Sequence, residues 1–103
     1  MLTKRALDGI SDYLKNMVKK VVYNTDGELI DAEQLIVECL SEGVVRIRFL
    51  IYPHKKCRVT ELQIIDIDDE PWYIKEENIV INSVNDRFYY MMKINVEESE
   101  AEK

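Results

Sequence analysis

The stretch VVRIRFLIY at residues 44–52, followed by PHKK and then by CRVTELQII at residues 57–65, carries the strongest strand pattern in the chain. Apolar and polar side chains alternate in both halves, as they do in a β-strand with one buried face. If residues 53–56 form a four-residue loop, the two halves pair as a hairpin. The core face of this predicted hairpin consists of Val45, Ile47, Phe49, Ile51, Thr60, Leu62 and Ile64.

The opposite face of the predicted hairpin is polar at one end and apolar near the loop. Arg48 lies across from Glu61 in this register, as an ion pair between neighbouring strands would, and Leu50 and Tyr52 add apolar surface towards the loop. Positive charge also gathers in this segment of an otherwise acidic chain. The candidate basic patch consists of Arg46, Arg48, Lys55, Lys56 and Arg58.

In the residues before the hairpin, the spacing of apolar side chains changes from that of a helix to that of a strand. Apolar residues from Leu7 to Val21 recur three or four positions apart, which is typical of one face of a helix. Thr3 is a suitable N-cap, but Gly9 costs about 1 kcal/mol relative to alanine inside a helix, so we expect regular helix from Ile10. The predicted elements are a helix within residues 2–20, strands at 21–24, 28–31 and 33–40, and turns at 25–28 and 41–44.

The residues after the hairpin favour further short strands. Trp72 is expected to anchor one strand after an acidic turn, NIVIN at 78–82 predicts another, and RFYYMMKIN at 87–95 predicts the last. One helix is thus followed by about six or seven strands without helices between them, a pattern typical of antiparallel sheets. The predicted fold class is α+β, with an N-terminal helix packed on an antiparallel β-sheet that curls into a small barrel or a sandwich.

The last predicted strand is apolar on both of its faces. One face is formed by Phe88, Tyr90, Met92 and Ile94. We expect the helix to cover this face with the side chains of Ile10, Leu14 and Met17. Tyr89 and Met91 put apolar bulk on the other face, and one helix shields only one side of a sheet. The apolar residues left without cover, the candidate partner interface, are Leu50, Tyr52, Tyr89 and Met91.

The composition indicates one folded domain. The chain has 103 residues, of which 47% are hydrophobic and 33% are charged, values typical of a domain with its own core. Residues 1–96 are predicted to form this domain, and EESEAEK at 97–103 a disordered acidic tail. No apolar run approaches the ~18 residues of a membrane helix, and MLTKRALDGI lacks a signal-peptide pattern. We therefore expect a soluble protein that is not exported.

The charge balance and the cysteines narrow the classes of function. A formal net charge of -6 argues against general nucleic-acid binding, and Cys39 and Cys57 alone do not make a disulfide framework. His54 and Cys57 form one H-x-x-C pair, which has fewer ligands than a zinc site needs. The same pair is the basis of a thiol-enzyme hypothesis, although the spacing shows neither an orienting group nor an oxyanion site. We expect no metal, cofactor or small-molecule substrate.

The segment VTELQIIDIDDEPWYIKEENIVI, with DRFYYMMKINVEE after it and the helix and KKVVYN before it, resembles small proteins from the tail and baseplate regions of prophages in Gram-positive bacteria. In that family a short helix leads to a strand, a long hairpin ends in a VTE-x-x-apolar-x-Asp segment, and an aromatic strand precedes an acidic end. The matching positions are Val59, Thr60, Glu61, Ile65 or Ile67, Asp66, Tyr90 and Glu97. The resemblance covers residues 10–98. It implies a phage-derived structural or accessory protein, located in the cytoplasm of the bacterial host or in the virion.

Three functional hypotheses remain open. The first is a non-enzymatic structural or interaction protein that associates with copies of itself or with other phage structural proteins. The second is a regulatory binding module whose basic patch contacts nucleic acid or an acidic protein. The third is a small thiol enzyme centred on Cys57 and activated by His54. The sequence favours the first hypothesis, because apolar surface is in surplus and no acid–base set converges.

Overall fold

The computed structural model describes residues 2–41 and 43–95. Within these residues one helix is followed by seven strands. The helix α1 is Lys4–Met17, and the strands are β1 Val18–Thr25, β2 Glu28–Asp31, β3 Glu33–Ser41, β4 Val44–Ile51, β5 Cys57–Asp66, β6 Pro71–Ile81 and β7 Phe88–Asn95. All of the strand pairs among them are antiparallel.

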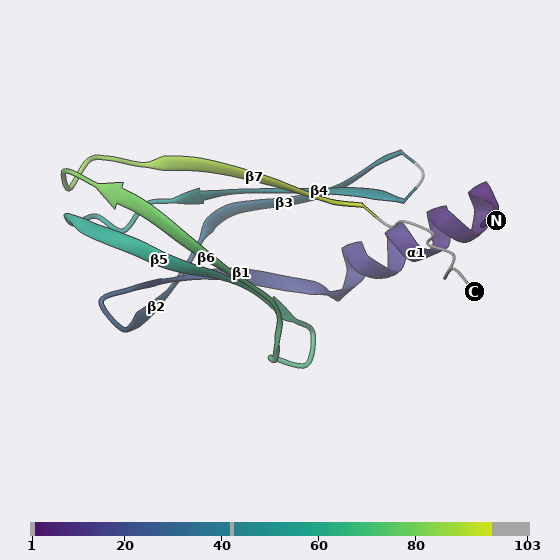
Figure 1. Ribbon diagram of the computed structural model, residues 1–103, viewed down its shortest axis with the longest axis horizontal. Coiled ribbons are helices and arrows are strands. Elements are labelled where there is room, and N and C mark those ends of the chain that lie inside the picture. The colour runs from purple at the N-terminus through teal and green to yellow at the C-terminus, as the bar shows by residue number, and fades with distance from the viewer. Residues whose placement is uncertain (1, 42, 96–103) are drawn as a thin grey trace, which may run out of the picture.

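The strands form two sheets that lie face to face (Figure 1). The strand order is β2-β1-β5-β6 in the four-stranded sheet and β3-β4-β7 in the three-stranded sheet. Helix α1 lies at one end of the sheets, where it contacts β1, β3 and β4. The predicted α+β class, with an N-terminal helix packed on antiparallel sheet, is therefore confirmed. Across the described residues the sheets form an open sandwich and not a closed barrel.

The hydrophobic core lies between the two sheets. The alternating residues of β4 that were predicted to face the core are buried, and Val45, Ile47 and Ile51 have no exposed surface. The buried apolar residues of this cluster are Val21, Tyr23, Val45, Ile47, Phe49, Ile51, Val59, Leu62, Ile64, Ile79 and Ile81. Both sheets contribute residues to this cluster, so the inward-facing side chains of each sheet form one side of the core.

The predicted hairpin between residues 44–52 and 57–65 is wrong. β4 pairs with β3 and β7, whereas β5 pairs with β1 and β6, so residues 53–56 carry the chain from one sheet to the other. Two strands that each have one apolar face are buried equally well as a hairpin or in opposite sheets of a sandwich. The expected cross-strand pair of Arg48 and Glu61 does not form, because the two residues belong to different sheets.

One residue of the predicted core face also lies elsewhere. Thr60 is exposed, while Val59 and Leu62 are buried. In the pairing of β1 with β5, Asn24 lies opposite Glu61 and Thr25 lies opposite Val59, so Thr60 is an extra residue on β5, and such a bulge interrupts the strict alternation of sides. Val59 and Leu62 therefore both point into the core, although they are three residues apart.

The helix begins earlier than predicted. Thr3 is the N-cap, and its Oγ1 accepts a hydrogen bond from the Ala6 amide at 3.2 Å. Gly9 consequently lies inside the helix, and the expected start at Ile10 is wrong. Leu14 packs against the core cluster and Ser11 is buried, so one face of α1 packs against the end of the sheets, beside β3 and β4 (Figure 1).

The predicted cover of the last strand is also wrong. Tyr90, Met92 and Ile94 pack against the core between the two sheets, and the Phe49 and Tyr90 rings stack with their centroids 5.1 Å apart. The four-stranded sheet, and not the helix, therefore covers the inner face of β7. Phe88, at the start of the strand, stays exposed.

The first hairpin agrees with the sequence prediction. Asp26 and Gly27 have φ values of 53° and 80°, the left-handed region that two-residue hairpin turns use. The Asn24 side chain accepts a hydrogen bond from the Gly27 amide at 3.1 Å. β1 and β2 are paired on either side of this turn, as predicted.

Two further predictions concern the chain as a whole. The described helix is neither long nor apolar enough to cross a membrane. The predicted acidic tail at 97–103, together with residue 96 at the end of the predicted domain, lies outside the described residues.

Candidate functional site

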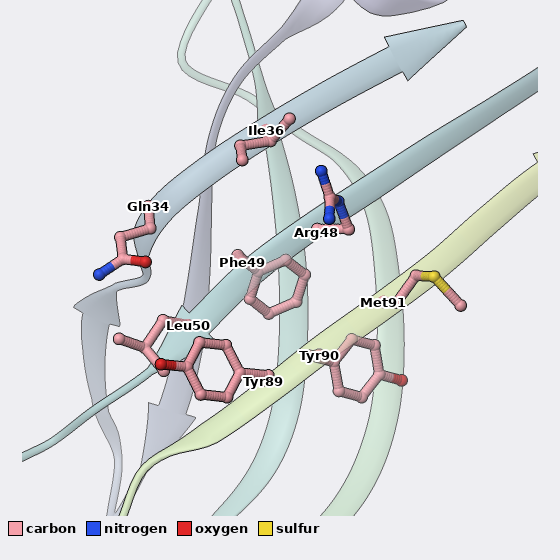
Figure 2. A pocket seen from close by; sticks show the side chains of 8 residues that line it. All are labelled: Gln34, Ile36, Arg48, Phe49, Leu50, Tyr89, Tyr90 and Met91. Carbon is pink, nitrogen blue, oxygen red and sulfur yellow. The ribbon is translucent and has the colours of Figure 1, made fainter. Parts of the chain in front are cut away.

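A hollow of about 250 Å³ lies on the outer face of the three-stranded sheet (Figure 2). It is lined by residues from three neighbouring strands: Gln34, Ile36, Arg48, Phe49, Leu50, Tyr89, Tyr90 and Met91. The strand register places Arg48 between Ile36 and Met91, and Leu50 next to Tyr89. The hollow therefore spans two adjacent rows of side chains that run across all three strands.

The hollow has a buried floor and an exposed rim. Leu50 forms the floor and is only 2% exposed, whereas Tyr89, Met91 and Ile36 on the rim are 69%, 54% and 46% exposed. Single exposed apolar residues are common on protein surfaces, whereas large contiguous groups of them are typical of interaction sites; here three such residues surround one hollow. A partner that covers this rim would remove three large apolar side chains from water.

Gln34 sits where β3 bends at the edge of the hollow. Its φ is 53°, a left-handed conformation that costs a non-glycine residue about 1–2 kcal/mol. The register between β3 and β4 shifts at the same place, between Glu33 and Ile36. Such strained residues concentrate at functional sites, and the bend leaves the Gln34 amide on the rim (Figure 2).

Glu38 holds two arginines beside the hollow. Arg48 Nη2 donates to Glu38 Oε1 at 2.7 Å, and Arg46 Nη2 donates to Oε2 at 3.2 Å. These hydrogen bonds, with that from Arg46 the strongest influence, lower the pKa of Glu38. One carboxylate neutralises only one of the two cations, and Lys93 lies opposite Arg46 on β7. This side of the sheet therefore carries a surplus of positive charge.

A second polar network ties the two sheets together next to the hollow. The Tyr90 hydroxyl donates to Glu77 Oε1 at 2.5 Å and accepts from Lys75 Nζ at 2.9 Å. Burial and then the bond to Glu77 raise the pKa of Tyr90, while Tyr90 and Lys75 lower the pKa of Glu77. The bond to Tyr90 is also the main cause of a raised Lys75 pKa. Each group keeps its usual protonation state near neutral pH, so the network fits a structural role better than proton transfer.

Three of the four residues of the predicted partner interface meet at the hollow. Leu50, Tyr89 and Met91 share the outer face of the sheet, with Leu50 as its floor. Tyr52 lies apart from them, after the end of β4. Its ring stacks on His54 at a centroid distance of 3.8 Å, and the guanidinium of Arg87 lies 4.6 Å from its centroid.

The residues of the predicted basic patch are divided between the sheets. β4 carries Arg46 and Arg48, β5 carries Arg58, and Lys55 and Lys56 lie in the crossing between them. Lys55 is also within 3.5 Å of a carboxylate of β2. Because β4 and β5 belong to opposite sheets, the five cations do not form one continuous surface.

The residues of the thiol-enzyme hypothesis are close in sequence but have other partners. His54 stacks on the ring of Tyr52, and no hydrogen bond joins it to Cys57 in the described part of the chain. Cys39 Sγ lies 3.8 Å from Asp12 Oδ1, and local desolvation followed by the Asp12 charge raises the pKa of its thiol. Residues 2–41 and 43–95 hold no group of three or more His, Cys, Asp or Glu side chains arranged to bind a metal.

Sequence reasoning missed several residues around the hollow. They are Gln34, Ile36, Glu38 and Lys93. The strand period of EQLIVECL indicates that Ile36 and Glu38 lie on the side opposite Leu35 and Val37. It does not reveal which strand lies beside them, because register depends on contacts that are distant in the sequence.

The lining of the hollow includes tyrosine, methionine and arginine side chains, residue types that are enriched at protein interfaces. In comparisons with known proteins, no family model, curated protein or solved structure matches the chain.

Proposed function

We propose that the protein is a structural or interaction protein that binds other protein surfaces through the outer face of its three-stranded sheet. The observation that carries this proposal is the exposure of Ile36, Tyr89 and Met91 around one buried floor. Full burial of a large apolar side chain is favourable by about 1.5–3 kcal/mol. A partner that covers all three would therefore gain several kcal/mol from this surface.

The backbone beneath the rim supports the same function. Every residue of the rim stands on a strand that is paired with a neighbour, so its position is largely set before a partner arrives. Surfaces held by sheets lose less conformational freedom on binding than surfaces formed by loops. The hollow is thus suited to a stable contact.

The proposed setting is a phage particle or its assembly. This part of the proposal rests on the resemblance of residues 10–98 to tail and baseplate proteins of prophages. The partners would be copies of this chain or other phage structural proteins, in the bacterial cytoplasm or in the virion.

A photoreactive phenylalanine analogue at position 89 tests the proposed surface. Tyr13 is a matched control, because it is 61% exposed but lies on α1, far along the chain from the hollow. After irradiation of cells that produce the protein, we expect a discrete protein adduct from position 89 and none of that mass from position 13. Equal adducts at both positions, or none at position 89, would contradict the proposal.

A second candidate function is the binding of an acidic protein through the cations beside the hollow. The observation that favours it is the surplus of Arg46, Arg48 and Lys93 over Glu38. An interface held mainly by these charges would weaken steeply as salt is added, whereas one held by the apolar rim would persist. Irradiating a lysate of the same cells at increasing salt concentration, and measuring the yield of the position-89 adduct, separates the two candidates.

A further inference from the structure

The two outer faces of the sandwich carry opposite charge. The basic face, on the three-stranded sheet, consists of Ile36, Glu38, Arg46, Arg48, Tyr89, Met91 and Lys93. The acidic face, on the four-stranded sheet, consists of two rows across its strands: Leu29, Asn24, Glu61 and Glu76, then Asp31, Val22, Gln63 and Ile74. The sheets pack with their inner faces together (Figure 1), so these two faces lie on opposite sides of the molecule.

The acidic face contains a pair of like charges on neighbouring strands. Glu61 of β5 lies directly opposite Glu76 of β6, an arrangement that destabilises a sheet. Gln63 Nε2 donates to Glu61 Oε1 at 2.6 Å, but Glu76 forms no ion pair with any described residue. Two cations also lie on this outer face: Lys20, in the next row, is 3.5 Å from Asp31, and Arg58 Nη1 donates to Asn78 Oδ1 at 2.6 Å. Among the described residues, neither cation forms an ion pair with either glutamate.

The basic face contains the corresponding pair of opposite sign. Arg46 of β4 lies directly opposite Lys93 of β7. Glu38 is shared between Arg46 and Arg48, and Lys93 has no carboxylate partner in the part of the chain that the structure describes. Each face therefore keeps one unfavourable pair that a charge from another molecule would relieve.

Exposed apolar residues flank both charge pairs at the same spacing. Met91 precedes Lys93 by two positions on β7, and Ile74 precedes Glu76 by two positions on β6; the two apolar side chains are 54% and 55% exposed. Two residues along a strand correspond to about 6.6 Å. The acidic face also has its own hollow of about 360 Å³, at the end where Leu29 and Asp31 lie. The two faces thus match in pattern and differ in sign.

We propose that the partner of the basic face is the acidic face of a second copy of this chain. This inference rests on the proposed function and names the partner of the same surface. In the docked pair, the Arg46–Lys93 pair of one copy meets the Glu61–Glu76 pair of the next, and both repulsions are relieved. The apolar residues beside each charge pair are buried in the same contact, so electrostatic complementarity sets the orientation while apolar burial adds affinity.

This contact joins two different surfaces and therefore repeats. In a docked pair, one copy still has a free acidic face and the other still has a free basic face. Further copies therefore add until the assembly closes as a ring or grows as a stack. A contact between two basic faces would instead bring two Arg46–Lys93 pairs together. Such a like-charge contact is unfavourable, and the charge pattern selects the repeating arrangement.

Two charge reversals test the contact without threatening the fold. Lys93→Glu places a carboxylate opposite Arg46, and Glu76→Lys places an ammonium group opposite Glu61, so each variant replaces a repulsive pair within its own sheet by an attractive one. Each variant now presents one altered face that repels the unaltered face of its own copies. We expect each variant alone to associate about tenfold more weakly than the wild type, or not at all.

Mixing the two variants should restore association. The Lys93→Glu variant keeps its acidic face and the Glu76→Lys variant keeps its basic face, so an intact contact forms only between them. Sedimentation velocity of each variant and of their equimolar mixture measures this recovery. Lys4→Glu and Asp8→Lys make the same changes in net charge on exposed positions of α1, and both should associate like the wild type.

The outcomes separate this inference from the proposed function. Unchanged self-association of either single variant, a mixture that stays monomeric, or a wild type that is monomeric throughout would overturn the inference. Loss of association in Lys93→Glu alone would indicate a contact between two basic faces and would overturn it as well. A discrete position-89 adduct with a different protein would then leave the proposed function standing, whereas the absence of any adduct would overturn both.

Discussion

Tyr89 and Tyr90 are neighbours in the chain and have opposite surroundings. Tyr90 faces the four-stranded sheet, stacks on Phe49 and ties β7 to β6 through Glu77 and Lys75. Tyr89 faces outward and makes up part of the rim of the hollow. Tyr90 thus stabilises the fold, whereas Tyr89, in our proposal, binds a partner.

Removing one hydroxyl group at each position should separate these roles. Tyr90→Phe deletes two hydrogen bonds between the sheets and should lower the free energy of unfolding by about 1–2 kcal/mol. Tyr89→Phe changes an exposed group and should alter it by less than about 0.5 kcal/mol. Urea denaturation of both variants measures the difference, and equal stabilities would contradict the role assigned to Tyr90.

Tyr23 gives a prediction for alkaline pH. Its ring is buried between the sheets, and burial, followed by the nearby Cys57 and Glu33, raises the pKa of its hydroxyl from 10.0 to about 12. The folded state therefore holds this proton more tightly than the unfolded state does. The stabilisation is complete below pH 10 and is lost as the pH rises towards 12.

Tyr23→Phe should make the protein less sensitive to this pH range. Both proteins will lose some stability as other groups ionise, but the wild type should lose more than the variant above pH 10. Urea midpoints measured on either side of pH 10 give the comparison. Parallel declines in the two proteins would show that Tyr23 does not contribute.

At the scale of single elements, two glycines should respond to alanine in opposite ways. Gly27 lies in the β1–β2 turn with φ of 80°, whereas Gly9 lies inside α1, and a Cβ at either position would meet no atom within 4 Å. The effect of each substitution on stability therefore depends on the backbone conformation at that position and not on a steric clash. Gly27→Ala should destabilise the protein by about 1 kcal/mol, and Gly9→Ala should stabilise the helix by a similar amount.

Urea denaturation measures the first change, and the helical signal in circular dichroism follows the second. A neutral or stabilising Gly27→Ala would contradict the turn geometry. A Gly9→Ala variant with unchanged helical signal on heating would contradict the placement of Gly9 inside α1.

The existence of most elements could be predicted from the sequence, but their partners could not. Alternation identified the buried face of β4, and the Asp26–Gly27 pair identified the first turn. Alternation could not tell a β4–β5 hairpin from two strands in opposite sheets, because both arrangements bury the same side chains. Arg48 accordingly pairs with Glu38 rather than Glu61.

The candidate site was predictable to the same degree. Tyr89 and Met91 could be identified from the sequence, because a strand that is apolar on both faces needs a second layer or a partner to shield its other face from water. Gln34 and Ile36 join them only through the register of β3 on β4. Lys93 belongs to the basic face because it lies opposite Arg46. No local sequence pattern reveals that pairing.

At the scale of the whole molecule, charge is distributed unevenly over a chain whose net charge is -6. Arg46, Arg48 and Lys93 lie on one side of the sandwich, and Glu61 and Glu76 lie on the other. Copies that approach with these sides facing attract one another despite their common net charge, because attraction between nearby groups exceeds repulsion between distant, screened ones. In our proposal, this distribution of charge sets the direction in which copies assemble.

This separation predicts a specific response to salt. Self-association of the wild type should weaken as salt rises, because the contact includes exposed charges. Lys93→Met keeps apolar bulk at the same position and removes the charge, so its association should be weaker at low salt and depend less on salt. Light scattering across a salt series compares them, and identical salt dependence would contradict a role for Lys93.

The most direct test of the account is the mass of the wild-type protein in solution as its concentration rises. Sedimentation velocity from about 1 μM to about 1 mM covers the range in which weak protein contacts form. We predict a monomer of 12.2 kDa at the lowest concentration and, with increasing concentration, species larger than a dimer. A protein that stays monomeric over the whole range, or stops at a dimer, would contradict the repeating contact between its two faces.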